Sequence, residues 1–241
     1  MDFATCGVLG PSERARGEPY RKGTYVDEWG VLWHVAQDGV VGEVKEPLLA
    51  DWSALRKFLP PWEMIQRAGS DAANRACAAN LADENPRFMI CATPVRPFER
   101  MQFLRGSENL FCDLAEESAE FFRLREMIFD FERKAMSLAV KTDADAVSFM
   151  DDWGSQTALL IGPAQWRRIY KPMYREYCDL AKKAGKKVFF HSDGYILDIY
   201  EDLIEIGVDA VNSQLFCMPI EEIARRFRGR ITFWGEIDRQ H

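Results

Sequence analysis

One histidine of this 241-residue chain follows a short apolar run, at the point where a strand is expected to give way to a loop. It is His191, which comes after Lys-Val-Phe-Phe and before Ser-Asp-Gly. A histidine at the C-terminal end of a strand is a candidate metal ligand or acid–base group, because its ring nitrogen binds metals and its charge changes near neutral pH. The alternative is a core or helix-capping histidine.

Asp193 lies two residues after His191, on the same side of the chain if the strand stays extended. Histidine nitrogen and aspartate oxygen are both zinc ligands, so the pair predicts a site for zinc or another divalent metal. Two ligands do not complete a metal site. Glu236, at the end of another expected strand, is the available third ligand. Alternatively, Asp193 caps a helix that begins near Tyr195.

Polar residues also follow the other apolar runs. Asp151 and Asp152 come after the run 146–150, and because they are adjacent, only one of them can face a given side of the strand. Further candidates follow the runs 208–212 and 231–234. We expect catalytic roles for His191, Asp152 and Glu236, metal ligation by His191 and Asp193, and substrate binding by Asp151, Gln214, Trp234 and Asp238.

These residues require a fold that brings strand ends together. Strands of apolar composition are expected at 88–92, 146–150, 187–190, 208–212 and 231–234, and helices at 107–140, 163–185, 195–206 and 219–227. Strands that alternate with helices predict βαβ units and a buried parallel sheet. The expected class is therefore α/β, a (β/α)8 TIM barrel whose active site lies at the C-terminal ends of its strands.

The part of the chain before residue 85 has a different character. The first 20 residues are rich in glycine, proline and charge, which indicates a loose lead-in. Asp38-Gly39 between two runs rich in aromatic and β-branched residues predicts a β-hairpin over 24–46. A helix is expected after Asp51, a possible N-cap, and a second one of about 20 residues after Pro60-Pro61. We therefore expect two domains, a lead-in with hairpin and helices at 1–84 and a barrel portion at 85–241.

Composition and charge exclude several classes of protein. The net charge of −7 argues against a general nucleic-acid binder, which needs a basic face. No apolar run approaches the roughly 20 residues that span a bilayer, so we expect a cytoplasmic protein without a membrane partner. Neither G-x-G-x-x-G nor a Walker pattern follows an expected strand, which disfavours a nucleotide-binding fold. The six cysteines form no C-x-x-C pair and are expected to be reduced.

Several motifs over residues 85–241 together resemble the uroporphyrinogen decarboxylase superfamily. They are D-D-W-G-S-Q-T at 151–157, K-V-F-F-H-S-D-G at 187–194, I-G-V-D at 206–209 and F-W-G-E-I-D at 233–238. The segment V-D-E-W-G at 26–30 is similar to the entry segment of the methyltransferase-like branch of that superfamily. The resemblance implies a (β/α)8 barrel, in agreement with the pattern of strands and helices.

The superfamily holds two chemistries. Some members decarboxylate a porphyrinogen without a metal, and others are methylcobalamin-dependent methyltransferases, many of which bind zinc through a His-x-Cys pair. His191 matches the zinc histidine, whereas Asp193 stands at the cysteine position and implies a harder metal site. The aspartate with which the decarboxylases bind the pyrrole groups has no match, because Cys91-Ala92-Thr93-Pro94 stands there.

The resemblance implies three functions to be distinguished. The first is a corrinoid-linked methyltransferase that acts on a small-molecule acceptor, with methylcobalamin as a substrate or on a partner protein, and a homodimer is possible. The second is decarboxylation of a tetrapyrrole or another carboxylate, and the third is non-catalytic binding of a corrinoid or tetrapyrrole. Because five strands are counted and a typical barrel of eight takes about 250 residues, we expect a C-terminal truncation of about 90–100 residues.

Overall fold

The computed structural model of the protein describes residues 3–235, and the chain divides into two compact units. Unit 1 is formed by Met1–Val8, Gly69–Arg96 and Arg133–His241, and unit 2 by Leu9–Ala68 and Pro97–Glu132. Each unit thus combines segments that are far apart in the sequence. The division into 1–84 and 85–241 concerns position along the chain, and it stays a prediction.

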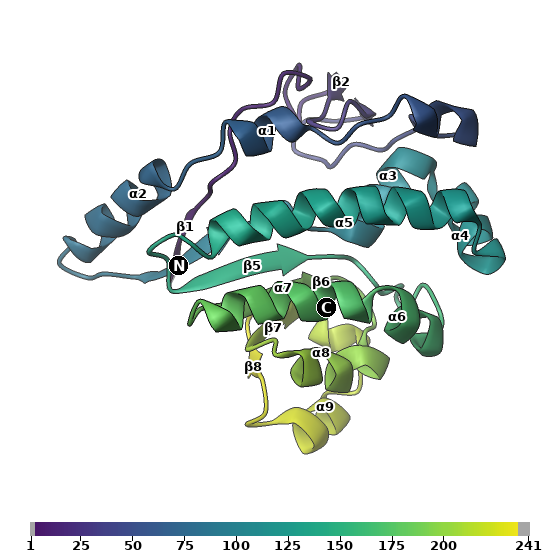
Figure 1. Ribbon diagram of the computed structural model, residues 1–241. Helices are drawn as coiled ribbons and strands as arrows, with labels where there is room; N and C mark the ends of the chain where they lie inside the picture. Colours follow the sequence, from purple (N-terminus) through teal and green to yellow (C-terminus); the bar gives the residue numbers. More distant parts are fainter. Residues whose placement is uncertain (1–2, 236–241) are drawn as a thin grey trace. The chain divides into compact units, whose positions relative to one another are not determined.

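Unit 1 is built on a parallel sheet of six strands in the order β1-β4-β5-β6-β7-β8 (Figure 1). The strands are β1 (Phe3–Cys6), β4 (Phe88–Ala92), β5 (Ala146–Met150), β6 (Lys187–Ser192), β7 (Ala210–Ser213) and β8 (Thr232–Phe233). Parallel neighbours must be joined by crossover connections, and helices supply them here. This confirms the expected α/β class with a TIM-barrel-like fold; within residues 3–235, β1 and β8 are the edges of the sheet.

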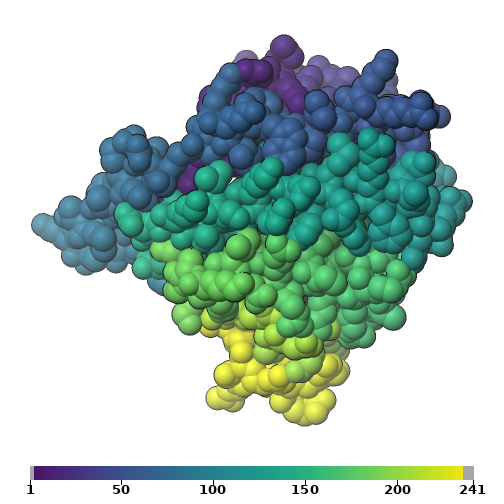
Figure 2. All heavy atoms as spheres, viewed as in Figure 1, coloured from purple at the N-terminus to yellow at the C-terminus, as the bar shows by residue number. Residues whose placement is uncertain are grey.

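Among residues 3–235, seven helical segments belong wholly to unit 1. They are α2 (Asp71–Leu81), α6 (Pro163–Ile169), α7 (Lys171–Lys183), the 3-10 helix η2 (Leu197–Ile199), α8 (Tyr200–Ile206), the 3-10 helix η3 (Leu215–Cys217) and α9 (Ile220–Phe227). Helix α2 packs against β1 and β4, and α7 packs against α6, α8 and β6. The atoms of α7 and α8, green in Figure 2, form one continuous layer.

The sheet has two faces that differ in what covers them. Because side chains alternate along each strand, the register places Val147, Phe149, Val188 and Phe190 together on one face. We call this the helix-covered face, since Phe149 lies 5.5 Å from the ring of Tyr174 and 5.8 Å from that of Tyr177, both on α7. The buried aromatic layer holds α7 on the sheet through hydrophobic burial.

The opposite face, which we call the inner face, carries aromatic side chains at one end of the sheet. Phe189 lies 5.7 Å from the ring of Phe88 and 5.3 Å from that of Trp234. Trp234 in turn contacts Phe3 of β1 edge to face, at 5.0 Å between ring centroids. The residue that follows β8 therefore reaches the strand at the other edge of the sheet, so the sheet curves around its inner face.

Unit 2 contains a two-stranded antiparallel hairpin and short helices. The hairpin pairs β2 (Gly23–Val26) with β3 (Leu32–Val35). The helical segments are the 3-10 helix η1 (Trp52–Arg56), α1 (Trp62–Gln66), α3 (Pro97–Arg105) and α4 (Ser107–Glu116). The long helix α5 (Ala119–Ala139) begins in unit 2 and continues into unit 1 from Arg133.

A buried ion pair organises the hairpin turn of unit 2. The Asp27 carboxylate accepts hydrogen bonds from the backbone N–H groups of Trp29 and Val31, both at 2.9 Å, and from Nε1 of Trp33 at 3.1 Å. Arg100 of α3 donates to the same carboxylate at 2.7 Å and stacks over the Trp29 ring at 4.9 Å. Both charged side chains are buried, so each compensates the desolvation of the other.

The five strands expected after residue 85 are confirmed within two residues at each end. The first 20 residues are not wholly a loose lead-in, because Phe3–Cys6 forms β1 and pairs with β4. The expected hairpin is also misplaced: its turn lies at 27–31, where Asp27 fixes the backbone and Gly30 adopts a φ of 86°. The segment after Asp38-Gly39 forms only the isolated bridge of His34 with Glu43.

The expected helices are present but interrupted. Asp51 is the N-cap of η1, as predicted, and accepts a hydrogen bond from the Ser53 N–H at 2.7 Å. The helix expected over 163–185 ends and restarts at Tyr170, because Pro172 has no N–H for a continuous helix. Within residues 3–235, no helix combines the length and apolarity needed to cross a membrane.

We predict that Asp27→Ala lowers the stability of the protein by about 3–5 kcal/mol, because the Arg100 guanidinium loses its buried partner. The change is measured as a lower urea midpoint in circular dichroism. Glu18→Ala, which removes the exposed Glu18–Arg21 pair, is the control and should cost less than about 1 kcal/mol. Equal midpoints for the two variants would contradict the role of the buried pair.

Candidate functional site

The alternation of side chains continues past the ends of the strands and divides the polar residues into two sets. Met150 pairs with His191 and His191 with Asn212, so these three side chains share the inner face. Asp152 and Asp193 each lie two residues beyond a member of this row. The residues that directly follow the row, Asp151, Ser192 and Ser213, point to the opposite face and are buried. The inner-face residues therefore meet at the C-terminal ends of β5, β6 and β7, and the buried residues lie behind them on the helix-covered face.

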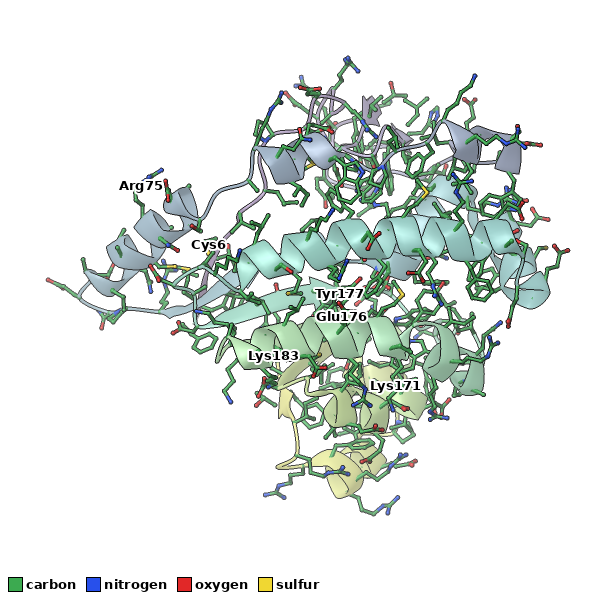
Figure 3. The ribbon with its side chains drawn as sticks, in the orientation of Figure 1. Cys6, Arg75, Lys171, Glu176, Tyr177 and Lys183 are labelled. Atoms are coloured by element: carbon green, nitrogen blue, oxygen red, sulfur yellow. The ribbon has the colours of Figure 1, made fainter. Side chains whose placement is uncertain are left out.

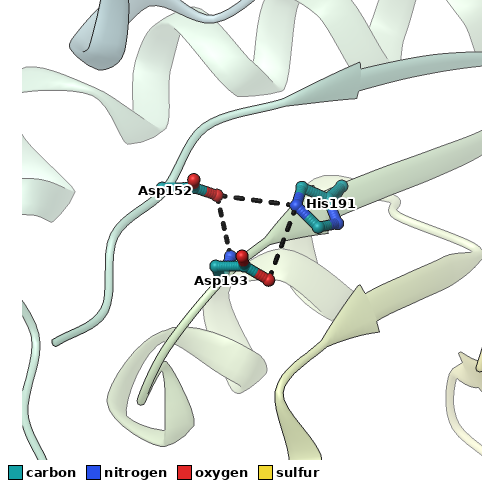
Figure 4. A group of neighbouring side chains, drawn as sticks. All are labelled: Asp152, His191 and Asp193. Atoms are coloured by element: carbon teal, nitrogen blue, oxygen red, sulfur yellow. Dashed lines mark hydrogen bonds and ion pairs between the residues drawn. The ribbon is translucent and has the colours of Figure 1, made fainter. Parts of the chain in front are cut away.

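Asp152, His191 and Asp193 form a compact group at these strand ends (Figure 4). Nε2 of His191 lies 3.6 Å from Oδ1 of Asp152 and 3.7 Å from Oδ1 of Asp193. The three ligand atoms all lie within 4.8 Å of one another. About a third of each side chain remains exposed, so a small molecule or an ion can reach the group.

Asn212 fixes which ring nitrogen of His191 faces the carboxylates. The Asn212 amide donates from Nδ2 to the carbonyl oxygen of Trp234 at 2.6 Å, which turns its Oδ1 toward His191. That oxygen lies 2.5 Å from Nδ1 of the ring, and since it can only accept, Nδ1 carries the proton. Nε2 of the neutral ring then presents its lone pair to the space between Asp152 and Asp193.

Backbone contacts hold the Asp152 carboxylate and the loop that carries Asp193. Oδ1 of Asp152 accepts a hydrogen bond from the N–H of Asp193 at 2.8 Å, and the carbonyl of Asp193 accepts from the N–H of Gly154 at 3.1 Å. The N–H of Gly194 donates to Oε1 of Gln214 at 3.1 Å. The loops after β5, β6 and β7 are thus tied directly to one another.

Two glycines allow the loops after β5 and β6 to meet backbone to backbone. A Cβ atom added to Gly154 would lie 2.2 Å from the backbone nitrogen of Tyr195, and one added to Gly194 would lie 2.2 Å from the carbonyl oxygen of Gly154. Gly194 also has a φ of 78°, which side chains disfavour. These glycines follow Asp152 and Asp193 closely, so their contact sets the separation of the carboxylates.

Asp151 lies on the other side of its strand from the group. Its fully buried carboxylate accepts a short hydrogen bond from the Tyr174 hydroxyl on α7, and that hydroxyl accepts from Nε1 of Trp153 at 2.8 Å. Burial, together with the negative charge of Asp151, raises the pKa of Tyr174 well above its usual value, so the phenol stays protonated and donates. This network anchors the chain on both sides of Asp152.

The geometry of the group fits a divalent metal. Atoms bound at about 2.0–2.2 Å to one tetrahedral ion lie roughly 3.3–3.6 Å apart, close to the two separations of 3.6 and 3.7 Å from Nε2. The donors are one imidazole nitrogen and two carboxylate oxygens, a set suited to zinc and to harder divalent ions. Without a metal, an imidazole and two carboxylates in this arrangement are groups of the kind that serve in general acid–base catalysis.

The structure brings only some of the expected residues together. Asp152, His191 and Asp193 form the group, and Gln214 contacts the loop that carries Asp193. Trp234 packs on the inner face and accepts the Asn212 hydrogen bond through its carbonyl, whereas Asp151 is not part of the group. Glu236 and Asp238 lie outside the described residues. The substrate-binding roles of these residues stay predictions.

Three residues near the group were not expected from the sequence. Asn212 and Tyr174 orient His191 and Asp151, and their roles depend on contacts between elements that no local pattern reveals. Arg96 places its guanidinium 3.1 Å from the sulfur of Met150, the residue beside His191 on the inner face.

Comparisons with known proteins agree with this architecture. Among solved structures, a methyltransferase from Methanosarcina mazei matches with a TM-score of 0.64 at 12% sequence identity, over 86% of this chain and 59% of that chain. At this identity the likeness is one of fold, and the chain spans 59% of the length of its neighbour. A comparison with the curated proteins gives no match.

A family model matches more than half of the chain. It is the model of uroporphyrinogen decarboxylase (URO-D), and the match runs over residues 40–241. This range includes Asp152, His191, Asp193 and Asn212, the residues of the group and its support. The resemblance seen in the sequence motifs is therefore confirmed, and the chain belongs to the uroporphyrinogen decarboxylase (URO-D) family.

Proposed function

We propose that this chain belongs to a methyltransferase that binds a divalent metal through Asp152, His191 and Asp193. The observation that carries the proposal is the convergence of Nε2 of His191 with two carboxylate oxygens at the C-terminal ends of adjacent parallel strands. Membership of the URO-D family and the methyltransferase fold neighbour support an enzyme of this kind. Zinc is the first metal to test, followed by manganese and magnesium.

The residues of the chain have distinct tasks in this proposal. His191 and the two aspartates hold the metal, which when bound would act as a Lewis acid on a heteroatom of the methyl acceptor. Asn212 keeps the proton on Nδ1 of His191 so that Nε2 remains a ligand.

The methyl donor in this proposal is a corrinoid, either free methylcobalamin or a methylated corrinoid on a partner protein. Asp193 supplies an oxygen ligand where many methyltransferases of the superfamily have a cysteine. The site would therefore favour harder divalent metals than a site with a thiolate ligand does. An acceptor other than a simple thiol is compatible with that site. A small molecule with a nitrogen or oxygen nucleophile is the alternative acceptor class.

The family match also favours a second candidate, decarboxylation of a tetrapyrrole or of another carboxylate. Two carboxylates at the site disfavour a substrate that carries many negative charges, because like charges repel. Incubation with uroporphyrinogen separates the candidates: carbon dioxide release that persists in His191→Ala would favour decarboxylation over a metal-dependent methyl transfer.

We expect the purified chain to bind one zinc ion with an affinity that falls more than tenfold in His191→Ala and in Asp193→Asn. Each variant removes one of the three converging ligand atoms. Isothermal titration with zinc, checked by metal analysis after gel filtration, measures the change. Glu221→Gln, on the exposed surface of α9, is the matched control and should bind like the unaltered chain. Equal binding by all four proteins would exclude the metal site.

We further expect Asn212→Leu to weaken zinc binding by about 10–100-fold, the usual effect of removing the partner of a metal-bound histidine. The variant keeps all three ligands but leaves Nδ1 of His191 without its acceptor. Nitrogen-15 NMR of the histidine ring should report the loss of the single tautomer along with the loss of affinity. A zinc affinity unchanged from the unaltered chain would show that Asn212 does not position His191.

The Asp193→Cys variant tests why this chain has aspartate at a position where cysteine is common in the superfamily. A thiolate is a softer ligand than a carboxylate, so the variant should gain affinity for zinc relative to manganese and magnesium. Competition titrations between the metals measure this ratio. If the ratio does not change, residue 193 is not a ligand.

Methyl transfer is assayed with methylcobalamin as donor and 2-mercaptoethanol or an amine as acceptor, by the absorbance change of the corrinoid. The proposal predicts turnover that requires added metal and is lost in His191→Ala. Corrinoid binding without turnover, while the metal still binds, would favour a non-catalytic corrinoid binder.

A further inference from the structure

Three of the six cysteines meet on the helix-covered face of unit 1, away from the inner face that carries the Asp152 group. Cys6 of β1 and Cys91 of β4 are direct partners in the parallel ladder, so their side chains point to the same face. Cys77 lies on α2, which packs against both of these strands. The Cys6 position, labelled in Figure 3, lies beside that helix.

The thiols of Cys91 and Cys77 both influence the pKa of the Cys6 thiol, which places the three side chains near one another. Cys77 and Cys91 are buried, whereas Cys6 is partly exposed and offers solvent a route to the cluster. The remaining cysteines lie elsewhere in the described chain: Cys112 is exposed, Cys178 is buried in α7 and Cys217 contacts Gln214.

We propose that Cys6, Cys77 and Cys91 are a reversible oxidation site, at which Cys6 forms a disulfide with one of its two thiol neighbours. Adjacent strands lie about 4.8 Å apart, within the roughly 4.4–6.8 Å between Cα atoms that disulfides span. The Cys6–Cys91 pair therefore meets the Cα requirement without a rearrangement of the backbone. Cys77 approaches the same two strands from helix α2.

The oxidant is a low-molecular-weight disulfide such as oxidised glutathione. The Cys6 thiolate attacks it, a protein–glutathione mixed disulfide forms and one glutathione leaves. The thiolate of Cys91 or Cys77 then attacks the Cys6 sulfur, and the second glutathione leaves as the intramolecular disulfide closes. In total, the protein gives up two protons and two electrons, and one glutathione disulfide takes them up to become two glutathione molecules.

The surroundings of the thiols disfavour the thiolate form. Burial raises the pKa of Cys6 to about 11 and that of Cys77 to about 11, so no stabilised thiolate holds the cluster in the reduced form. Exchange at neutral pH is slow for the same reason, because only the thiolate attacks. The closed disulfide would tie β1, an edge strand, covalently to β4 or to α2.

The test is an equilibrium titration of the full chain in glutathione buffers of increasing oxidised fraction. Free thiols are alkylated in denaturant, and the protein is mapped by mass spectrometry without reduction. We expect the oxidised chain to have lost two alkylation sites and to yield a peptide pair that joins Cys6 to Cys91 or Cys77. Glutathionylation of the exposed Cys112 shows in the same sample that the oxidant acts.

Single variants distinguish a shared Cys6 from random oxidation. Cys6→Ser should form no intramolecular disulfide, while Cys77→Ser and Cys91→Ser should each retain a bridge from Cys6 to the remaining neighbour. Cys178→Ser is the matched control and should behave like the unaltered chain. A cluster that stays fully reduced while Cys112 is glutathionylated, or an intramolecular disulfide that persists in Cys6→Ser, would overturn the proposal.

Discussion

The candidate site depends on one constraint, the strict alternation of side chains along parallel strands in register. Because Met150, His191 and Asn212 are aligned across β5, β6 and β7, every second residue beyond them points to the inner face. Asp152 and Asp193 take those positions, and the intervening Asp151, Ser192 and Ser213 turn toward the helices. A shift of one residue in the pairing of β5 with β6 would bring Asp151 to the inner face and separate the group.

The side chains of His191 and Asp152 are each held by a partner that belongs to another element. The amide of Asn212 orients the His191 ring from β7, the Asp193 N–H binds the Asp152 carboxylate, and the contact of Gly154 with Gly194 sets the spacing of the two loops. Behind them, the buried Asp151–Tyr174–Trp153 network fixes the chain around Asp152. His191 and Asp152 are therefore oriented before anything binds between them, which is a condition for a preorganised metal or acid–base site.

Much of this arrangement could be predicted from the sequence, and the remainder depends on contacts between distant segments. The apolar runs before Asp151 and His191 identify two strands. The His-x-Asp spacing indicates that His191 and Asp193 lie on the same side of the chain. Which of Asp151 and Asp152 joins them is not visible in the sequence, because both faces of the strand carry apolar residues. The role of Asn212 requires the cross-strand register, and β1 was missed because Phe3–Cys6 is short and finds its partner only in β4. The hairpin was misplaced because Asp38-Gly39 is the stronger local turn signal, whereas the turn is stabilised by the long-range Asp27–Arg100 pair.

The most direct test of the account is the anomalous diffraction of crystals grown with zinc, recorded at the zinc absorption edge. We predict one strong peak at about 2.0–2.2 Å from Nε2 of His191 and from a carboxylate oxygen of both Asp152 and Asp193, with Nδ1 still bound to Asn212. A zinc ion bound through Nδ1, or one bound elsewhere while these three residues stay free of metal, would contradict the account.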